Sequence, residues 1–289
     1  MNKVRAGKAH EISGSDTLYL EACTKAAKAT DRRTQPFSNI PAKPRAWALK
    51  ASYMTTVSSG LLEKMEPIKR ANSEREITIL DVVRNRFKPY FGMTEAELAE
   101  TFGYAKPGTR KPKDLCALIT KKILGVAENS KITEFEKAGI KPKTMRIKRN
   151  GVPKESVSFP TFDYCELAET DFEESDFRSY LQTKYLFVMY REDPHEKGVY
   201  RLADTVFWQM DDNDIEEAKR CYEDMRQRVI TGHADQSVKS TENRCCHVRP
   251  HGHNAADTCM TPYGVPVTKK CFWLNAKYLA DQLSTNKAL

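Results

Sequence analysis

The chain has 289 residues, of which 40% are hydrophobic and 30% charged, so its composition indicates a globular protein with one large domain or slightly more. No apolar run approaches the roughly 20 residues that cross a bilayer, and the N-terminus lacks the apolar core of a signal peptide. We therefore expect a cytoplasmic protein, and its eight cysteines, which follow no small secreted framework, are expected to be free thiols.

The net charge of +8 is distributed unevenly along the chain. Residues 1–60 carry ten Lys/Arg against four Asp/Glu, and residues 106–154 carry fourteen against four. Residues 155–230 reverse the balance, with nine against nineteen. This segregation predicts a basic surface for a polyanion such as nucleic acid and an acidic surface facing away. Ordinary solvated faces that cluster in sequence would give the same counts.

The first half of the chain predicts short elements followed by helices. Residues 1–60 are punctuated by prolines and predict short, irregular elements. "SEREITILDVVRNRFKPYFG" has one apolar stripe and predicts a helix with Ser73 as its N-cap. The next helix is expected to open at Thr94 and close at Gly103, and a third lies in "KPKDLCALITKKILG". The last two could form a helix-turn-helix, but any pair of amphipathic helices has this spacing.

After residue 130 the apolar period changes from that of helices to that of strands. A helix at 211–230 interrupts the strands, with an acidic first turn and a buried face of Ile215, Ala218, Tyr222, Met225 and Val229. A last helix is expected at 275–284. The order predicts an α/β domain over residues 65–289, with strands in "KTMRIKR", "ESVSF", "YLFVMYR", "VYRLADTVFWQM", "CCHVRP" and "KKCFWL".

An internal echo links the two ends of the chain. "AWALKASYM" (46–54) and "CFWLNAKYL" (271–279) share an aromatic residue, a leucine two positions on and a tyrosine four further. The matching segments upstream, "YLEACTKAA" and "HVRPHGHNA", are similar in position but weak in identity. A repeat that begins so early predicts that the first copy is the tail of a domain that starts upstream.

Three blocks of this sequence resemble one family: "KAHEIS…QPFSNIPAKPRAWALKASYMT", "FEKAGIKPKTMRI…VPKESVSF" and "CHVRPHGHNAAD…VTKKCFWLNAKYL". They are similar to the MutH-related restriction endonucleases of the Sau type, which cut DNA at GATC and carry two MutH-like domains in tandem. The resemblance implies that residues 1–60 are the tail of an upstream catalytic domain plus a linker. It implies that residues 65–289 are the second, regulatory domain, an α/β PD-(D/E)xK fold with a central mixed sheet flanked by helices.

The family's active site implies an aspartate, followed by Glu-x-Lys, that hold and use Mg²⁺. In this sequence Glu134 falls at the aspartate position, Lys141 at the glutamate position and Lys143 at the lysine position. A unit charge pair at ~4 Å is worth about 4 kcal/mol at an effective dielectric of ~20, so a cation in place of the anion opposes metal binding. Pro142 also removes a backbone donor from a strand. We expect no catalytic Mg²⁺ and no metal site in this chain, although the intact family enzyme uses Mg²⁺.

A rearranged metal site is the alternative. Glu136 has the same parity as Glu134 if the segment is extended, and Glu155 is also nearby in sequence. With either carboxylate the chain would be an active Mg²⁺-dependent endonuclease. Solvent-facing glutamates are the simpler interpretation of both.

The segments "HVRPHG" and "KKCFWL" match the family's DNA-reading cleft. The resemblance therefore implies base or groove contacts from an arginine, a histidine and a tryptophan, whose chemistry fits base edges and sugars. Lysines nearby would contact phosphates. Burial of the tryptophan in the core, and lysines that merely end a strand, are the alternatives. The expected DNA-binding residues are Arg249, His251 and Trp273, with Lys154, Lys269 and Lys270 on phosphates.

The same segment, "RCCHVRPHGHNAADTCMTPYG", also contains residue types that bind zinc. His247 and His251 fit H-x₃-H, and Cys245, His253 and Cys259 are available. No C-x₂-C pair exists there, and adjacent Cys245 and Cys246 would point to opposite faces of a strand. A zinc-dependent binding module is therefore a minor alternative.

These observations predict a protein that binds a GATC-type site in double-stranded DNA as the effector half of a type II restriction endonuclease. It would not cleave DNA alone, and its partners would be DNA and a catalytic MutH-like domain in cis or in trans. Dimerisation on DNA is left open. Lys25, Lys28, Arg32 and Arg33 would add non-specific attraction to DNA.

Overall fold

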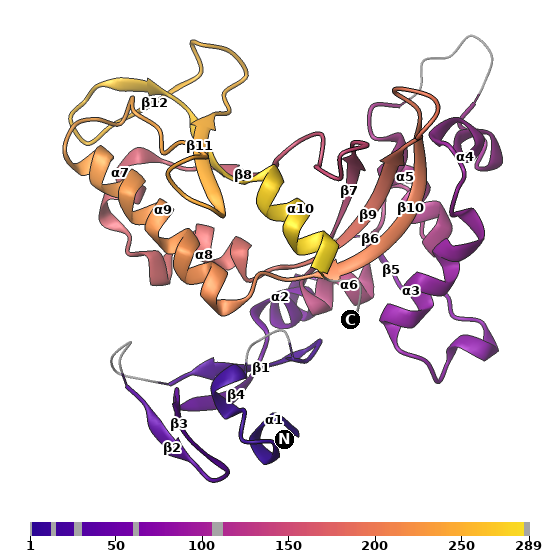
Figure 1. Cartoon of the computed structure of the whole chain (residues 1–289), viewed down its shortest axis with the longest axis horizontal. Helices are drawn as coiled ribbons and strands as arrows, with labels where there is room; N and C mark the ends of the chain where they lie inside the picture. The colour runs from indigo at the N-terminus through magenta and orange to yellow at the C-terminus, as the bar shows by residue number, and fades with distance from the viewer. Residues whose placement is uncertain (1, 13–15, 26–30, 60–63, 106–111, 286–289) are drawn as a thin grey trace. The chain divides into compact units, whose positions relative to one another are not determined.

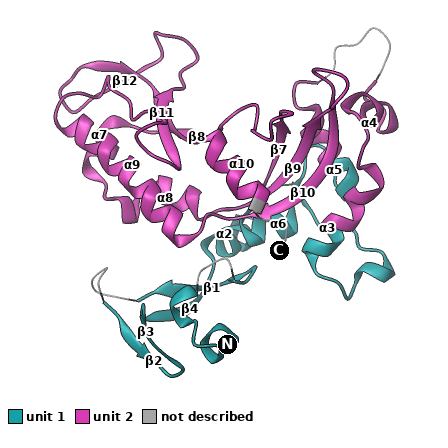
Figure 2. Ribbon diagram, viewed as in Figure 1, with its two compact units in different colours: residues 1–82, 121–141 teal, residues 83–120, 142–289 magenta. Residues whose placement is uncertain are grey.

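The computed structural model describes residues 2–12, 16–25, 31–59, 64–105 and 112–285. The chain divides into two compact units (Figure 2). The first contains residues 1–82 and 121–141, and the second contains residues 83–120 and 142–289. The expected boundary near residues 60–65 is not where these units divide.

The first unit consists of short elements and small sheets (Figure 1). β1 pairs with β4 and β2 with β3, both antiparallel, and β5 pairs with β6 in parallel. Helix α2 packs against α6. Its elements are α1 (Asn2–Arg5), η1 (Ala9–Glu11), β1 (Leu20–Thr24), β2 (Arg33–Gln35), β3 (Ser38–Ala42), β4 (Arg45–Leu49), α2 (Ala51–Ser59), β5 (Met65–Glu66), η3 (Asn72–Glu74), β6 (Lys131–Ile132) and α6 (Thr133–Ala138).

Close packing at the end of α6 requires a glycine. Gly139 has φ +64° and ends the helix in the left-handed conformation. A Cβ built there would lie 3.0 Å from Oγ of Ser52, whose hydroxyl donates to the carbonyl of Lys137 at 3.3 Å. Only glycine meets both demands without strain, so this position fixes how α6 meets α2.

The two similar segments near the ends of the chain have the same succession of secondary-structure elements. β1 and β4 pair and lead into α2, while β11 (Cys246–Pro250) and β14 (Lys270–Leu274) pair and lead into α10 (Ala276–Thr285). Their burial differs, because Trp47 and Leu49 are exposed whereas Leu274 is buried. The first copy thus has the local structure of the second without the same apolar cover.

Three helices follow β5 and lead toward the larger unit. α3 (Ile79–Phe87) starts later than expected, because the Thr78 hydroxyl accepts from the backbone N–H of Asp81, while Ser73 lies in η3. α4 (Glu95–Thr101) opens at Thr94, as predicted, with a capping box to Glu97. α5 (Leu115–Leu124) begins well beyond the short turn of a helix-turn-helix, so that interpretation is wrong.

The described part of the second unit contains three sheets. One has the order β10-β9-β7, another β11-β14-β8, and a small ribbon pairs β12 with β13. The strands predicted after residue 130 are confirmed, although the segment 133–138 is helical. The bounds are β7 (Ile140–Ile147), β8 (Val157–Thr161), β9 (Lys184–Glu192), β10 (Tyr200–Trp208), β12 (Thr258–Met260) and β13 (Pro266–Thr268), with a short 3-10 helix η4 (Lys88–Tyr90) near the unit's start.

Helix α9 (Asp212–Ile230) covers the inner face of the β11-β14-β8 sheet and forms the core with it. Asp211 caps it, and all five residues of the predicted apolar stripe are buried, as expected. Shorter helices that the sequence analysis missed pack on α9: α7 (Tyr164–Glu169), α8 (Asp176–Leu181) and the 3-10 helix η5 (Phe172–Glu174). Helices of three to six residues are too short to show a reliable apolar period.

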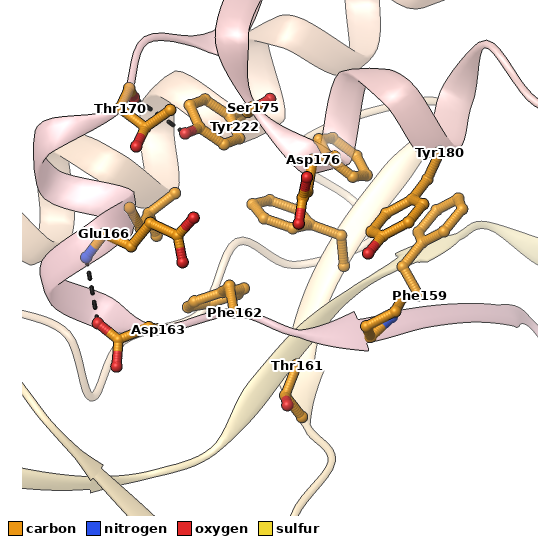
Figure 3. Close-up of a pocket in the computed structure, with 14 residues that line it drawn as sticks. Phe159, Thr161, Phe162, Asp163, Glu166, Thr170, Ser175, Asp176, Tyr180 and Tyr222 are labelled. Carbon is orange, nitrogen blue, oxygen red and sulfur yellow. Dashed lines mark hydrogen bonds between the residues drawn. The ribbon is translucent and has the colours of Figure 1, made fainter. Parts of the chain in front are cut away.

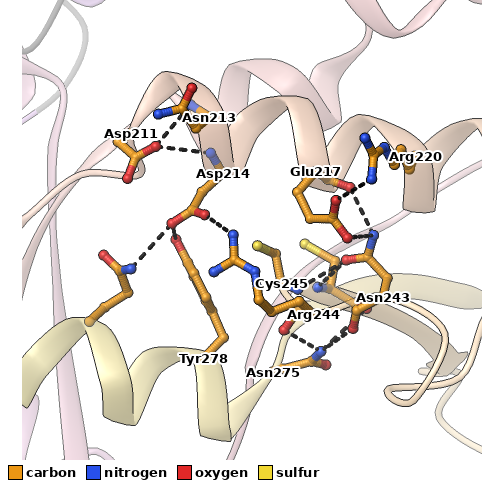
Figure 4. A network of polar contacts seen from close by, with 12 residues as sticks. Asp211, Asn213, Asp214, Glu217, Arg220, Asn243, Arg244, Cys245, Asn275 and Tyr278 are labelled. Atoms are coloured by element: carbon orange, nitrogen blue, oxygen red, sulfur yellow. Dashed lines mark hydrogen bonds and ion pairs between the residues drawn. The ribbon is translucent and has the colours of Figure 1, made fainter.

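A buried carboxylate joins the start of α9 to the last helix (Figure 4). Asp214 is 4% exposed and accepts hydrogen bonds from the Tyr278 hydroxyl at 2.8 Å and from Nε2 of Gln282 at 3.2 Å. Arg244 forms an ion pair with the same carboxylate. Burial, and then Asp214, raise the pKa of Tyr278, so its hydroxyl stays a donor.

No helix in the described part of the chain is long and apolar enough to cross a bilayer.

Candidate nucleic-acid interface

The β11-β14-β8 sheet presents one apolar and one polar face. Val248, Phe272 and Leu274 point into the core beneath α9. Strand residues alternate between faces, so His247 and Arg249 on β11 and Trp273 on β14 belong to the other face. The pairing places His247 opposite Trp273, and Trp273 opposite Ser158 of β8. The residues expected to read DNA therefore share a face that α9 does not cover.

Three of the expected DNA-binding residues form a cluster on this polar face, here called the arginine–indole cluster (Arg249, His251 and Trp273). The guanidinium carbon of Arg249 lies 3.7 Å from the centroid of the Trp273 ring. The His251 ring meets the same indole edge to face, with centroids 5.0 Å apart. Arg249 and His251 are exposed, whereas Trp273 is half-buried. The indole thus supports two exposed hydrogen-bond donors and is not a core residue.

His247 packs against the indole of Trp273. It is 9% exposed, and its ring stacks on Trp273 at 6.3 Å with an interplanar angle of 17°. Its Nδ1 lies 2.5 Å from Oδ1 of Asn275, whose amide nitrogen donates to the carbonyls of Asn243 and Arg244 (Figure 4). Since Oδ1 is then the acceptor, Nδ1 carries the proton. Sequence analysis assigned His247 no supporting role, although its i, i+2 relation to Arg249 placed both on one strand face.

The loop that carries His251 is closed by an ion pair. The backbone N–H of His251 donates to the carbonyl of Lys269 at 2.9 Å. Nζ of Lys269 lies 2.7 Å from Asp257, whose carboxylate also accepts from the backbone N–H of His253 at 3.0 Å. Lys269 is partly exposed, so its ammonium is near the surface but already paired. Its position is compatible with a phosphate contact that competes with Asp257.

Lys270 does not lie on the surface, which corrects the expectation that it contacts phosphate. It is 3% exposed, and its ammonium donates to the carbonyls of Ala234 and Asp235, both at 2.7 Å. Burial lowers the pKa of Lys270 to about 8. The reason is strand parity: Lys270 shares the inward face with Phe272 and Leu274. It therefore ties β14 to the 234–235 turn.

Lys154 is exposed and lines a cavity of about 440 Å³, here called the polar cavity. The cavity lies beside the arginine–indole cluster, because Ser158 lines it and pairs with Trp273. Lys143 also lines it, and its Nζ donates to the carbonyl of Ser158 at 3.4 Å. From the sequence, Lys143 was identified only as the remnant of a catalytic lysine. Its place in a cavity could not be predicted, because the residues that line the cavity come from α4, α5, β7, β8 and β9.

A smaller cavity, of about 80 Å³, lies among α7, α8 and β8 and is lined largely by aromatic rings, including Phe159 and Tyr180 (Figure 3). The residues that line it include Asp163, Glu166 and Asp176. Asp163 is committed to capping α7 and accepts from the Cys259 thiol at 2.9 Å. Acidic groups in the lining repel phosphates, so this cavity is not part of a nucleic-acid interface.

The positions that would hold catalytic Mg²⁺ do not fit the ion. Glu134 lies in helix α6, not in an extended segment, and both its carboxylate oxygens lie 3.1 Å from the backbone nitrogen of Ile68. Lys141 is exposed on β7 and brings a positive charge where a ligand is needed. Among the described residues no group of three or more His, Cys, Asp or Glu side chains is arranged to hold a metal.

The glutamates considered for a rearranged site are placed differently from one another. Glu136 lies two positions after Glu134 on a helix, so the shared parity expected for an extended segment is wrong. Its carboxylate is 3.9 Å from Nζ of Lys131. Glu155 is exposed and lines the polar cavity. Within the described residues no hydrogen bond or ion pair joins either glutamate to Glu134, which instead accepts from the backbone of Ile68.

The zinc alternative finds no support in the placement of its residues. Cys245 is buried, and burial raises the pKa of its thiol to about 12. His247 is bonded to Asn275, and the Cys259 thiol donates to Asp163. A zinc site needs thiolates and imidazoles that converge on one point. Here Cys245 is buried, and His247 and Cys259 are bonded to other residues.

The N-terminal cations are exposed in the part of the chain that the structure describes. Lys25 and Arg32 lie in surface segments, and Arg33 opens β2. Lys28 lies outside the described residues. The side chains of Lys25, Arg32 and Arg33 are thus accessible to solvent.

Comparison with known proteins matches residues 124–220 to the family described as DNA mismatch repair enzyme MutH. Over 331 aligned positions the chain is 31% identical to the type II restriction enzyme Sau3AI of Staphylococcus aureus. That alignment covers 97% of this chain and 67% of the enzyme. The MutH match contains Lys143 and Lys154, and the arginine–indole cluster lies beyond its end.

Proposed function

Because the chain belongs to the MutH-related family of restriction endonucleases, we propose that it binds a GATC-type site in double-stranded DNA as the effector half of such an enzyme. Binding would stimulate a catalytic MutH-like domain supplied in cis or in trans. The arginine–indole cluster is the observation that carries this proposal: an exposed guanidinium held flat on an aromatic ring, beside an exposed imidazole.

The chemistry of the cluster suits base recognition in a groove. An arginine can donate two hydrogen bonds to O6 and N7 of guanine, and a histidine can donate to N7 or to a phosphate. A fixed guanidinium loses less conformational freedom on binding than a free one. Pro250 restricts the backbone between Arg249 and His251, which further limits that loss.

The chain would not cleave DNA by itself. Lys141 stands where the family's chemistry uses a metal-binding carboxylate, and Glu134 is committed to the backbone N–H of Ile68. A divalent ion would meet a cation and an engaged carboxylate there, so we propose that this chain needs no metal cofactor. The Mg²⁺ of the intact family enzyme would belong to the catalytic domain.

A mobility-shift titration tests the proposal. Duplexes with GATC and with the same bases scrambled are compared at two salt concentrations, with wild type and Arg249→Lys. We expect preference for GATC in wild type and loss of about 1–3 kcal/mol of that preference in the variant, because lysine cannot form the paired hydrogen bonds. Equal affinity of the wild type for both duplexes would remove the site-specific function.

A further inference from the structure

The polar cavity contains a buried polar group that the protein itself does not satisfy. Tyr190 on β9 is 1% exposed and lines the cavity. Its hydroxyl has no hydrogen-bond partner of normal geometry within the described residues, and its polar neighbour is the thiol of Cys116. Buried hydroxyls are normally paired, and an unpaired one facing a cavity points to a water or ligand oxygen that completes it.

The hydroxyl and the thiol at this position are both uncharged donors. Burial raises the pKa of Tyr190, so the phenol stays protonated and can donate to an anion. Burial, and then Glu95, raise the pKa of Cys116 to about 12, so no thiolate adds negative charge to the cavity wall. The lining therefore does not repel an anion at its buried end.

The charged side chains that line the cavity give it a positive balance. Four basic residues line it: Lys113, Lys143, Arg146 and Lys154. Of its three acidic residues, Asp114, Glu155 and Glu95, the last is bound by Arg146 through contacts of 2.8 and 3.1 Å. The lining thus has four basic side chains against three acidic ones. This balance favours an anionic ligand over a metal ion.

The cavity continues the face that carries the arginine–indole cluster. Ser158 joins the two, since it pairs with Trp273 and its carbonyl accepts from Lys143. Cys271 on β14 pairs with Arg249, and both Arg249 and Lys143 oppose the rise that burial causes in the pKa of its thiol. A polyanion in contact with Arg249 therefore has lysines immediately along its path.

We propose that the polar cavity holds the sugar–phosphate backbone of the DNA strand that the arginine–indole cluster contacts, with Lys143 and Lys154 on neighbouring phosphates. The Tyr190 hydroxyl donates to a phosphate oxygen or to its bound water. This inference rests on the proposed DNA binding and adds that the contacted DNA strand passes through the polar cavity. The lysine at the position of a catalytic residue is then a phosphate ligand.

The test combines duplexes in which one phosphate is made neutral with protein variants in which one cavity side chain is replaced. Wild type, Lys143→Gln and Tyr190→Phe are titrated with GATC duplexes that each carry one methylphosphonate. We expect Lys143→Gln to bind the unmodified duplex about three- to tenfold more weakly, with a slope of log affinity against log salt shallower by about 0.9, the value for one phosphate contact. One methylphosphonate position that weakens wild type should have no effect in Lys143→Gln, since the two changes remove the same contact.

The Tyr190→Phe variant and a control variant complete the design. Tyr190→Phe should reduce affinity about two- to tenfold without loss of thermal stability, because the hydroxyl it removes is unpaired in the free protein. Lys219→Gln is the matched control, since Lys219 lies on α9 and pairs with Glu173 at 3.2 Å, away from the polar face. It should leave the salt slope unchanged.

Different outcomes would overturn the proposed path of the strand and the proposed binding of GATC-type sites. If every methylphosphonate costs Lys143→Gln as much as it costs wild type, the strand does not enter the cavity, even though preference for GATC persists. If inorganic phosphate raises the melting temperature of wild type but not of Lys143→Gln, and the duplex results are additive, the cavity binds free phosphate instead. Failure of wild type to prefer GATC overturns the proposed function itself.

Discussion

The guanidinium of Arg249 rests on the indole of Trp273, 3.7 Å from the ring centroid, and the indole in turn rests on His247. This stack couples an exposed cation to a buried imidazole through one aromatic side chain. A cation on an aromatic face gains about 0.5–2 kcal/mol, more where water is excluded. The orientation of Arg249 therefore depends on Trp273.

Replacement of Trp273 tests that dependence. We expect Trp273→Leu to lower DNA affinity about three- to thirtyfold, because a leucine fills space but offers no ring to the guanidinium. Trp273→Phe should retain most of the affinity. Titration of the GATC duplex measures both. Equal losses in the two variants would show that the indole contributes something other than its aromatic face.

Because Lys270 is buried, we expect the free energy of unfolding to depend on pH in the alkaline range. Its folded pKa of about 8 lies below the ordinary 10.5, so the folded protein binds fewer protons than the unfolded chain between these values. The free energy of unfolding should therefore rise with pH through that window, by on the order of 2–3 kcal/mol relative to Lys270→Met. Denaturant unfolding of both proteins at pH 7.5 and pH 10 measures it.

The same variant separates a buried lysine from a phosphate contact. Lys270→Met should leave the salt dependence of DNA binding unchanged, whereas loss of a phosphate contact would make the slope shallower by about 0.9. A shallower slope in Lys270→Met would restore the surface position that sequence analysis expected.

Glu134 is expected to act on stability and not on catalysis. Glu134→Ala leaves the buried N–H of Ile68 without its carboxylate partner, so we expect a loss of about 1–3 kcal/mol in the free energy of unfolding. Glu136→Ala, in the same helix, should cost less than about 1 kcal/mol, because it breaks only a surface pair. Neither wild type nor variant should nick GATC-containing plasmid with Mg²⁺ or Mn²⁺. Nicking by wild type that disappears in Glu134→Ala would identify a working metal site.

The carboxylate of Asp214 is expected to hold α9 and α10 together. Asp214→Ala leaves the buried Tyr278 hydroxyl without its acceptor and removes the ion pair with Arg244. We expect a loss of about 2–4 kcal/mol, or a melting temperature about 5–15 °C lower. Asp212→Ala removes an exposed carboxylate from the same helical turn and is the control. Similar melting temperatures for the two variants would mean that the network contributes little.

His247 predicts a loss of stability in acid. Burial lowers its pKa below the usual 6.5, although the hydrogen bond with Asn275 opposes the shift. The unfolded chain therefore takes up a proton more readily, and stability that is present above pH 6.5 declines as the pH falls through the folded pKa. Thermal unfolding from pH 7.5 to pH 5 should show a steeper decline in wild type than in His247→Gln. Parallel declines would assign the pH dependence to other groups.

Regular patterns along the chain were enough for most of the fold. The stripe of α9, the start of α4 at Thr94 and the strands after residue 130 were predicted because each is specified by local spacing. The segment around Glu134 was not, since a six-residue helix and a strand cannot be told apart over so short a length. The compact units do not divide at residues 60–65, because residues 121–141 join a unit that is distant in sequence.

By itself the sequence determined which residues could do chemistry: a lysine where the family uses a carboxylate, and an arginine, a histidine and a tryptophan within 25 residues of one another. Tertiary structure decided which of them face outward. Strand alternation says that Lys270 and Phe272 share a face, but only the packing of α9 buries that face and leaves Arg249 on the other. The cavity around Lys143 likewise exists only because five separate elements meet there, and no local pattern encodes such a meeting.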